Sequence, residues 1–112
     1  PDSKSGEIIE NLLHDGRVVT AGIVLTELLQ GAKVKEEFEA ILENVVALPM
    51  LKTTTDTWIE AGRISFALRR KGITIPITDL IIAGLALQNE CQILTLDPHF
   101  KKIPGVSLYK QN

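Results

Sequence analysis

The stretch TDLIIAGLALQNECQILTLD, residues 78–97, contains the most apolar segments of the chain, and each borders an aspartate. An unbroken apolar run follows Asp79, and a second apolar segment, residues 93–96, is followed by Asp97. A carboxylate beside such a segment costs free energy unless it caps a helix, is paired or holds a metal ion. These two aspartates are therefore the first candidates for a functional site.

Around this stretch, segments with helical periodicity alternate with short apolar strand patterns. Helices are predicted from Ser3 or Ser5 to residue 13, over 23–30 and 35–46, from Thr55 or Asp56 to residue 70, and from Thr78 or Asp79 to residue 89. Strands are predicted over 17–19, within 46–51, over 92–96 and over 106–109, with an extended segment over 73–77. Strands separated by helices imply an α/β domain with a parallel sheet.

The last long helix is apolar around most of its circumference, which predicts a buried layer helix against the sheet. In open parallel sheets, ligands bind beyond the carboxyl ends of the strands. Asp97 follows its strand directly, and Asp79 opens a helix at what should be the same edge. We therefore expect both carboxylates to face a common cleft.

Composition indicates one ordinary globular domain over residues 1–112. Of these residues, 45% are hydrophobic and 23% are charged, and the net charge of −2 gives no global attraction to nucleic acid. The apolar runs are too short to span a bilayer, and no secretory signal is visible. The single cysteine, Cys91, cannot form an internal disulfide, which favours a cytoplasmic location.

Each candidate residue also has an ordinary structural explanation. Asp79 suits a helix N-cap or first turn, although Thr78 could cap the helix and leave Asp79 facing the cleft. Asp97 before Pro98 is a routine turn start. His99 could act as a base, but a locally hydrogen-bonded turn residue explains it more simply.

The basic and aromatic residues are interpreted in the same way. Clusters of lysine and arginine usually form solvated faces, but Lys101 follows Asp97 closely enough to border the site and contact phosphates. Arg63 and Arg70 share a helix face with Phe66, a combination that favours a protein interface. Trp58, early in the same helix, is expected in the core or at an interface.

Three stretches resemble the PIN domain and, within it, the VapC-type toxins of toxin–antitoxin pairs. VLTELLQG (residues 24–31) resembles the family's helix with an acidic residue before a leucine pair. TIPITDLIIA (residues 74–83) resembles the segment that carries its third acid. ILTLDPHF (residues 93–100) matches its ending, in which threonine, aspartate, histidine and phenylalanine recur. The resemblance covers nearly the whole chain.

The resemblance implies a three-layer α/β/α fold around a central parallel sheet and metal-dependent cleavage of RNA. Glu27, Asp79 and Asp97 occupy the positions of the acids that hold Mg²⁺ or Mn²⁺, with Glu27 on the wall of the cleft. Thr95 and Lys101 are expected to orient a ligand, water or substrate. The expected partners are an RNA substrate, a cognate antitoxin and a second copy of the chain in a homodimer, with no membrane.

One feature of the family is missing from residues 1–112. The family opens with an apolar strand that ends in aspartate, and no apolar strand precedes Asp2. We expect this strand upstream, and residues 1–112 alone to be inactive or nearly so. The main alternative is a non-catalytic PIN-like interaction or dimerisation module with an incomplete metal site. A receiver-like phosphoacceptor domain is less consistent, because it requires an acid pair near the first strand and a lysine after the last core strand.

Overall fold

The structure is a computed structural model that describes residue 11 and residues 14–95 and 97–109. The chain divides into two compact units, the first formed by residues 1–51 with 111–112 and the second by residues 52–110. Each unit is described by itself. None of the helices in the described residues combines the length and apolar character that a bilayer crossing requires.

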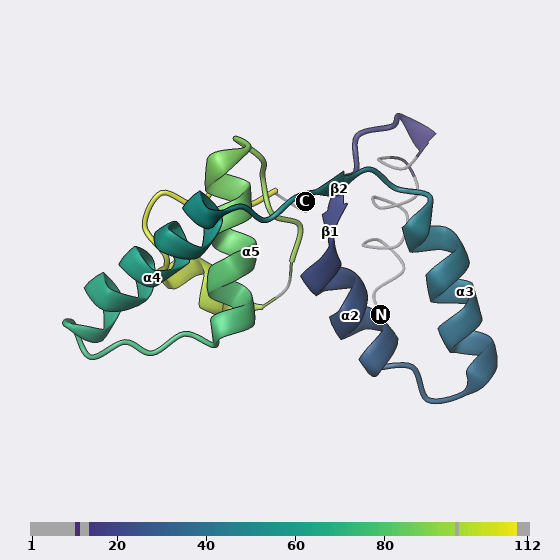
Figure 1. Ribbon diagram of the computed structural model, residues 1–112, viewed down its shortest axis with the longest axis horizontal. Coiled ribbons are helices and arrows are strands. Elements are labelled where there is room, and N and C mark those ends of the chain that lie inside the picture. The colour runs from purple at the N-terminus through teal and green to yellow at the C-terminus, as the bar shows by residue number, and fades with distance from the viewer. Residues whose placement is uncertain (1–10, 12–13, 96, 110–112) are drawn as a thin grey trace. The chain divides into compact units, whose positions relative to one another are not determined.

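The first unit contains a short parallel sheet and two helices (Figure 1). Its elements are β1 (Thr20–Ala21), α2 (Gly22–Gln30), α3 (Lys35–Val46) and β2 (Met50–Leu51). β1 pairs with β2 in parallel, with Thr20 opposite Met50 and Ala21 opposite Leu51. Parallel strands require a crossover connection, which α2 and α3 supply here. The predicted parallel pairing and the helices predicted over 23–30 and 35–46 are confirmed.

The strand predicted over residues 17–19 is wrong, because the paired segment of β1 begins at Thr20. Its position is set by the partner strand: the backbone N–H of Thr20 donates to the carbonyl of Pro49 at 2.9 Å. Pro49 has no N–H of its own, so β2 begins only at Met50, as expected for a proline at the start of a strand. The helix predicted before residue 14 lies outside the described residues, apart from Asn11 and His14, which are helical.

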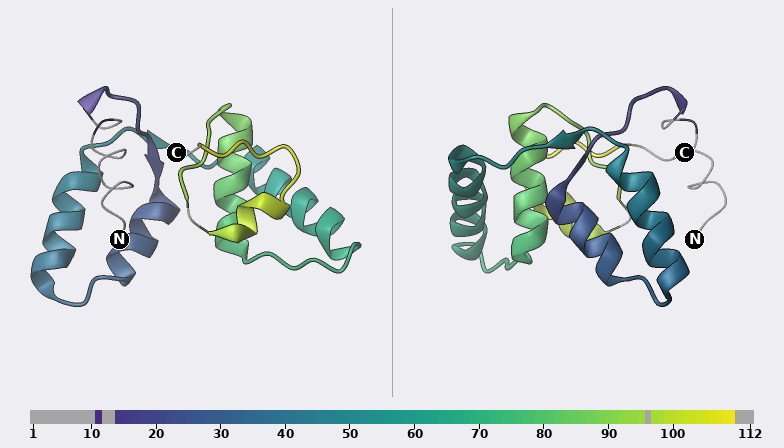
Figure 2. Two further views of the ribbon diagram at one scale, coloured as in Figure 1. Left: turned by 180° about the vertical axis from the view of Figure 1, so that it is seen from behind. Right: turned by 45° about the vertical axis from the view of Figure 1, so that its right-hand side comes forward.

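The second unit is built on two packed helices, α4 (Thr55–Arg69) and α5 (Ile77–Gln88), followed by the 3₁₀ helix η1 (Pro98–Lys102). Figure 2 shows α4 and α5 side by side from two directions. Gly84 of α5 faces α4 closely, and a Cβ there would lie 3.4 Å from the carbonyl oxygen of Thr57, in van der Waals contact. Thr57 is fully buried, and its hydroxyl hydrogen-bonds the side chain of Gln88 across the two helices.

The core of the second unit is aliphatic, with one aromatic ring. It consists of Ala61, Ile64, Leu68, Ile75, Leu80, Ala83, Ala86, Ile93, Phe100 and Ile103. Half of the α5 helix is buried, so the prediction of a buried layer helix is confirmed. Trp58 does not belong to this core, because 52% of its surface is exposed.

The predicted last two strands are reduced to one parallel bridge between Ile93 and Leu108. The N–H of Ile93 donates to Ser107, and the N–H of Tyr109 donates back to Ile93, both at 2.9 Å. The predicted direction of pairing is therefore confirmed, while the predicted strand lengths are wrong. Leu96 lies outside the described residues.

The predicted N-caps of two helices, Thr55 or Asp56 and Thr78 or Asp79, are also wrong by one to three residues. The N-cap of α4 is Thr54, whose N–H donates to the hydroxyl of Thr57 at 3.0 Å. The N-cap of α5 is Pro76, so neither Thr78 nor Asp79 occupies the cap position. This shift places Asp79 within the first turn of the helix, where its carboxylate is available for other contacts.

Candidate metal centre

Asp79 lies in the first turn of α5 and is one of the few buried polar residues, with 8% of its surface exposed. Pro76 sets the start of this helix, and the N–H of Leu80 donates to the Pro76 carbonyl at 3.1 Å. A carboxylate in the first turn complements the helix dipole. Burial nevertheless requires a direct partner, which Asp79 Oδ2 finds 3.0 Å away at Nδ1 of His99.

Asp97 is held at the start of η1 by three contacts. Its Oδ1 accepts the backbone N–H of His99 at 2.9 Å, which makes Asp97 the N-cap of the 3₁₀ helix. Its own N–H donates to the hydroxyl of Thr95 at 3.0 Å. The same Oδ1 also lies 3.1 Å from Nδ1 of His99. Asp97 therefore caps the start of the turn, as expected, and its carboxylate also contacts the imidazole of His99.

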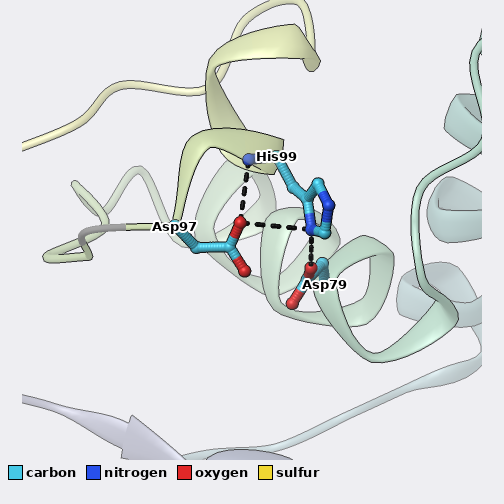
Figure 3. A group of neighbouring side chains, drawn as sticks. All are labelled: Asp79, Asp97 and His99. Atoms are coloured by element: carbon cyan, nitrogen blue, oxygen red, sulfur yellow. Dashed lines mark hydrogen bonds and ion pairs between the residues drawn. The ribbon is translucent and has the colours of Figure 1, made fainter.

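Figure 3 shows the imidazole of His99 beside both carboxylates, with one ring nitrogen facing an oxygen of each. Asp79, Asp97 and His99 each offer a ligand atom, and these atoms lie within 4.8 Å of one another. Asp79 comes from α5, whereas Asp97 and His99 come from the turn after the Ile93 bridge. Because like charges this close repel, the pair favours a cation or a hydrogen-bond donor between them.

The other predicted site residues are placed as follows. Thr95 is half-buried and fixes the backbone of Asp97. Lys101 is exposed on η1, on the chain segment that also carries His99. Glu27 is exposed on α2 in the first unit, so its inclusion in the site stays a prediction.

His99 is the residue that the sequence interpretation underestimated. The available signal was its position two residues after Asp97, at the start of a turn. A capping aspartate and the residue whose N–H it accepts are held close together, so the side chain of that residue also starts close to the carboxylate. The second contact, to Asp79, depends on packing of segments 20 residues apart and has no local signature.

The donor set fits a divalent cation. Carboxylate oxygens are preferred ligands of Mg²⁺ and Mn²⁺, and imidazole is a less favoured ligand of these ions. Two carboxylates on separate elements converge here, and one of them is buried. This arrangement is costly without a counter-charge, which gives the cluster a physical reason to bind one.

Comparison with known proteins assigns the chain to a family. The sequence profile of the PIN domain matches residues 2–106. The tRNA(fMet)-specific endonuclease VapC of Salmonella typhimurium is 31% identical over 101 residues, covering 86% of this chain and 76% of that protein.

Two solved structures are similar in fold. VapBC2 from Rickettsia felis, bound to a DNA fragment from its promoter, matches with a TM-score of 0.75 at 27% identity, covering 90% of this chain and 82% of that chain. VapBC-5 from Mycobacterium tuberculosis, a member of the VapBC family of toxin–antitoxin systems, matches with a TM-score of 0.67 at 26% identity. The match covers 80% of this chain and 76% of that chain. The α/β fold class inferred from the sequence is thereby confirmed, and the chain belongs to the PIN domain family, among its VapC-type members.

Proposed function

We propose that this protein is a metal-dependent endoribonuclease, the toxin of a type II toxin–antitoxin pair acting in the cytoplasm. The observation that carries the proposal is the convergence of Asp79 and Asp97 around His99. The VapC relative, which is named as an endonuclease specific for tRNA(fMet), supports RNA as the substrate class. The solved relative from a toxin–antitoxin system supports an antitoxin as the protein partner.

Asp79, Asp97 and Glu27 are the residues proposed to hold Mg²⁺ or Mn²⁺. The bound ion would polarise the scissile phosphate and lower the pKa of a coordinated water, which makes that water a nucleophile at neutral pH. Burial of Asp79 keeps bulk water from one side of the site. Thr95 fixes the chain that carries Asp97, and Lys101, exposed on the same 3₁₀ helix as His99, is proposed to contact a backbone phosphate.

An exposed apolar face of α4 supports the proposed homodimer. Trp58, Ile59 and Phe66 are 52%, 44% and 65% exposed. The guanidinium of Arg70 lies over the ring of Phe66, 5.4 Å from its centroid. Exposed aromatic residues with arginine are typical of protein interfaces. This face is therefore the proposed contact between two copies of the chain.

The test of the nuclease proposal is a cleavage assay, with a mixed tRNA substrate, on the full-length protein, meaning the product of its complete gene. Cleavage is expected in Mg²⁺ or Mn²⁺, complete loss in excess EDTA, and recovery when the metal ion is added back. Protein treated with EDTA and dialysed into metal-free buffer serves as the control for damage by the chelator. Full activity in excess chelator would contradict the metal-dependent mechanism.

We also propose that residues 1–112 hold an incomplete ligand set, because they contain no apolar strand ending in aspartate. A version extended at its N-terminus by an apolar strand that ends in aspartate is expected to melt at a higher temperature and to cleave RNA. Residues 1–112 alone are expected to be inactive or nearly so. A side-by-side thermal melt and RNA-cleavage assay of the two chains measures both effects.

A third chain, in which the aspartate of the added strand is replaced by asparagine, separates the effect of the strand on stability from the effect of its aspartate on cleavage. It should keep the gain in melting temperature and lose the gain in cleavage. If residues 1–112 match the extended chain in both assays, the site is complete with Glu27, Asp79 and Asp97. If the extended chain binds a partner but never cleaves RNA, the non-catalytic interaction module is the better description.

A further inference from the structure

We infer that His99 is a positioning residue that stands in for the cation, holding Asp79 and Asp97 together until a metal ion displaces its imidazole. This inference rests on the proposed function, because it takes both carboxylates as metal ligands. It assigns to His99 neither a catalytic proton transfer nor a ligand position in the loaded site.

The geometry around Nδ1 is nearly symmetric. Nδ1 lies 3.0 Å from Asp79 Oδ2 and 3.1 Å from Asp97 Oδ1. Ionised carboxylates only accept hydrogen bonds, so Nδ1 is the atom that carries the hydrogen. The imidazole therefore hydrogen-bonds Asp79 and lies at ion-pair distance from Asp97, so one group contacts both carboxylates, as a bridging cation would.

The imidazole and a bridging ion compete for the same space. An Mg²⁺ ion sits about 2.0–2.1 Å from its ligand oxygens and prefers oxygen to nitrogen. A cation held by Asp79 and Asp97 would need the space beside these carboxylates that the imidazole of His99 now occupies (Figure 3). The ring must therefore move when the ion binds.

The imidazole of His99 is exposed enough to leave the site. The side chain of His99 is 38% exposed, so it can rotate toward solvent without unpacking the core. Asp97 stays in place when this happens, because the backbone N–H of His99 still holds its Oδ1 at 2.9 Å. Asp79 is the carboxylate that depends on the imidazole, since its side chain is only 12% exposed.

The experiment compares metal affinity and apo stability in the full-length protein and three variants. His99→Ala removes the placeholder, and His99→Asn keeps a side-chain N–H close to the position of Nδ1. His14→Ala, which changes the other histidine of the chain at an exposed position, is the matched control. Mn²⁺ binding is measured by titration calorimetry, and melting temperature is measured in EDTA and in saturating Mn²⁺.

His99→Ala is expected to bind Mn²⁺ about tenfold more tightly, because the ion no longer displaces hydrogen bonds to charged groups. In EDTA the same variant should melt about 4 °C or more below the wild type, since Asp79 loses its hydrogen-bond partner and Asp97 loses the imidazole beside it. Its gain in melting temperature on adding Mn²⁺ should be the largest of the set. His99→Asn should lie close to the wild type in all three measurements, and His14→Ala should match it.

Weaker Mn²⁺ binding by His99→Ala would overturn the inference and make His99 a metal ligand. Equal affinity in the wild type, His99→Ala and His99→Asn would overturn it as well. If the wild type binds Mn²⁺ and only the behaviour of His99 differs from expectation, the proposed function stands. If no protein of the set binds Mn²⁺, the metal site of the proposed function fails, and the inference fails with it.

Discussion

Asp79→Asn is expected to lower RNA cleavage by the full-length protein by at least about a hundredfold, as loss of a single electrostatic group at a reaction centre does. Asparagine has nearly the same shape, so the helix and its packing should be unchanged. The substitution removes the charge of Asp79, which is the buried carboxylate of the described residues, with 8% of its surface exposed. Initial cleavage rates in saturating Mn²⁺ measure the effect.

Asp56→Asn is the matched control for this variant. Asp56 occupies the first turn of α4, as Asp79 occupies the first turn of α5, but it is exposed. Any loss of the favourable interaction with the helix dipole is common to both variants, so only the loss specific to Asp79 reports on the metal site. Far-UV circular dichroism verifies that both variants are folded. Undiminished cleavage by Asp79→Asn would rule out Asp79 as a ligand.

The helices were predictable from the sequence because their signals are local. The apolar spacing of residues 35–46 alone gives α3 its observed bounds, Lys35–Val46. The helix starts were less accurate, since Thr54, Thr55 and Asp56 are all acceptable N-caps and one hydrogen bond, from Thr54 to Thr57, decides between them. Boundaries depend on such single contacts, whereas the existence of a helix depends on many residues.

The strands were harder to predict because pairing is not local. The apolar residues 17–19 have strand character, but the ladder is set by the position of Pro49 in the partner segment. Likewise, the sequence pattern of residues 92–96 predicts a full strand, but within the described part, 92–95, only Ile93 has a bridge partner, at Leu108. A strand needs a second segment at matching register, which periodicity in one segment does not specify.

In the candidate site, too, some features are local and predictable, whereas others depend on the packing of distant segments. That Asp79 and Asp97 each border an apolar segment is visible in the sequence, and their convergence followed from placing both at one edge of a parallel sheet. The bridging contact of His99 was not predictable, because it joins residues from two packed segments. Family resemblance, rather than periodicity, is what adds Glu27 to the proposed ligands.

Phe100→Ala is expected to destabilise the protein by about 3–5 kcal/mol, the usual cost of truncating a buried phenylalanine. The ring is 4% exposed, belongs to the core of the second unit, and follows His99 directly on η1. With a total stability of about 5–15 kcal/mol for a domain of this kind, the loss is a large fraction of the whole. Urea unfolding monitored by circular dichroism measures the change in free energy of unfolding.

Phe66→Ala makes the same chemical change at a ring that is 65% exposed, so it should alter the free energy of unfolding by no more than about 0.5 kcal/mol in dilute, monomeric protein. The contrast tests whether η1 is anchored through its aromatic side chain. If it is, Phe100→Ala should also weaken Mn²⁺ binding below the unfolding transition, because Asp97 and His99 lie on the turn that Phe100 fixes. Phe100→Leu fills most of the lost volume and should recover much of both effects. Equal stability of the Phe100→Ala and Phe66→Ala proteins would show that the turn carrying Asp97 is held by its backbone alone.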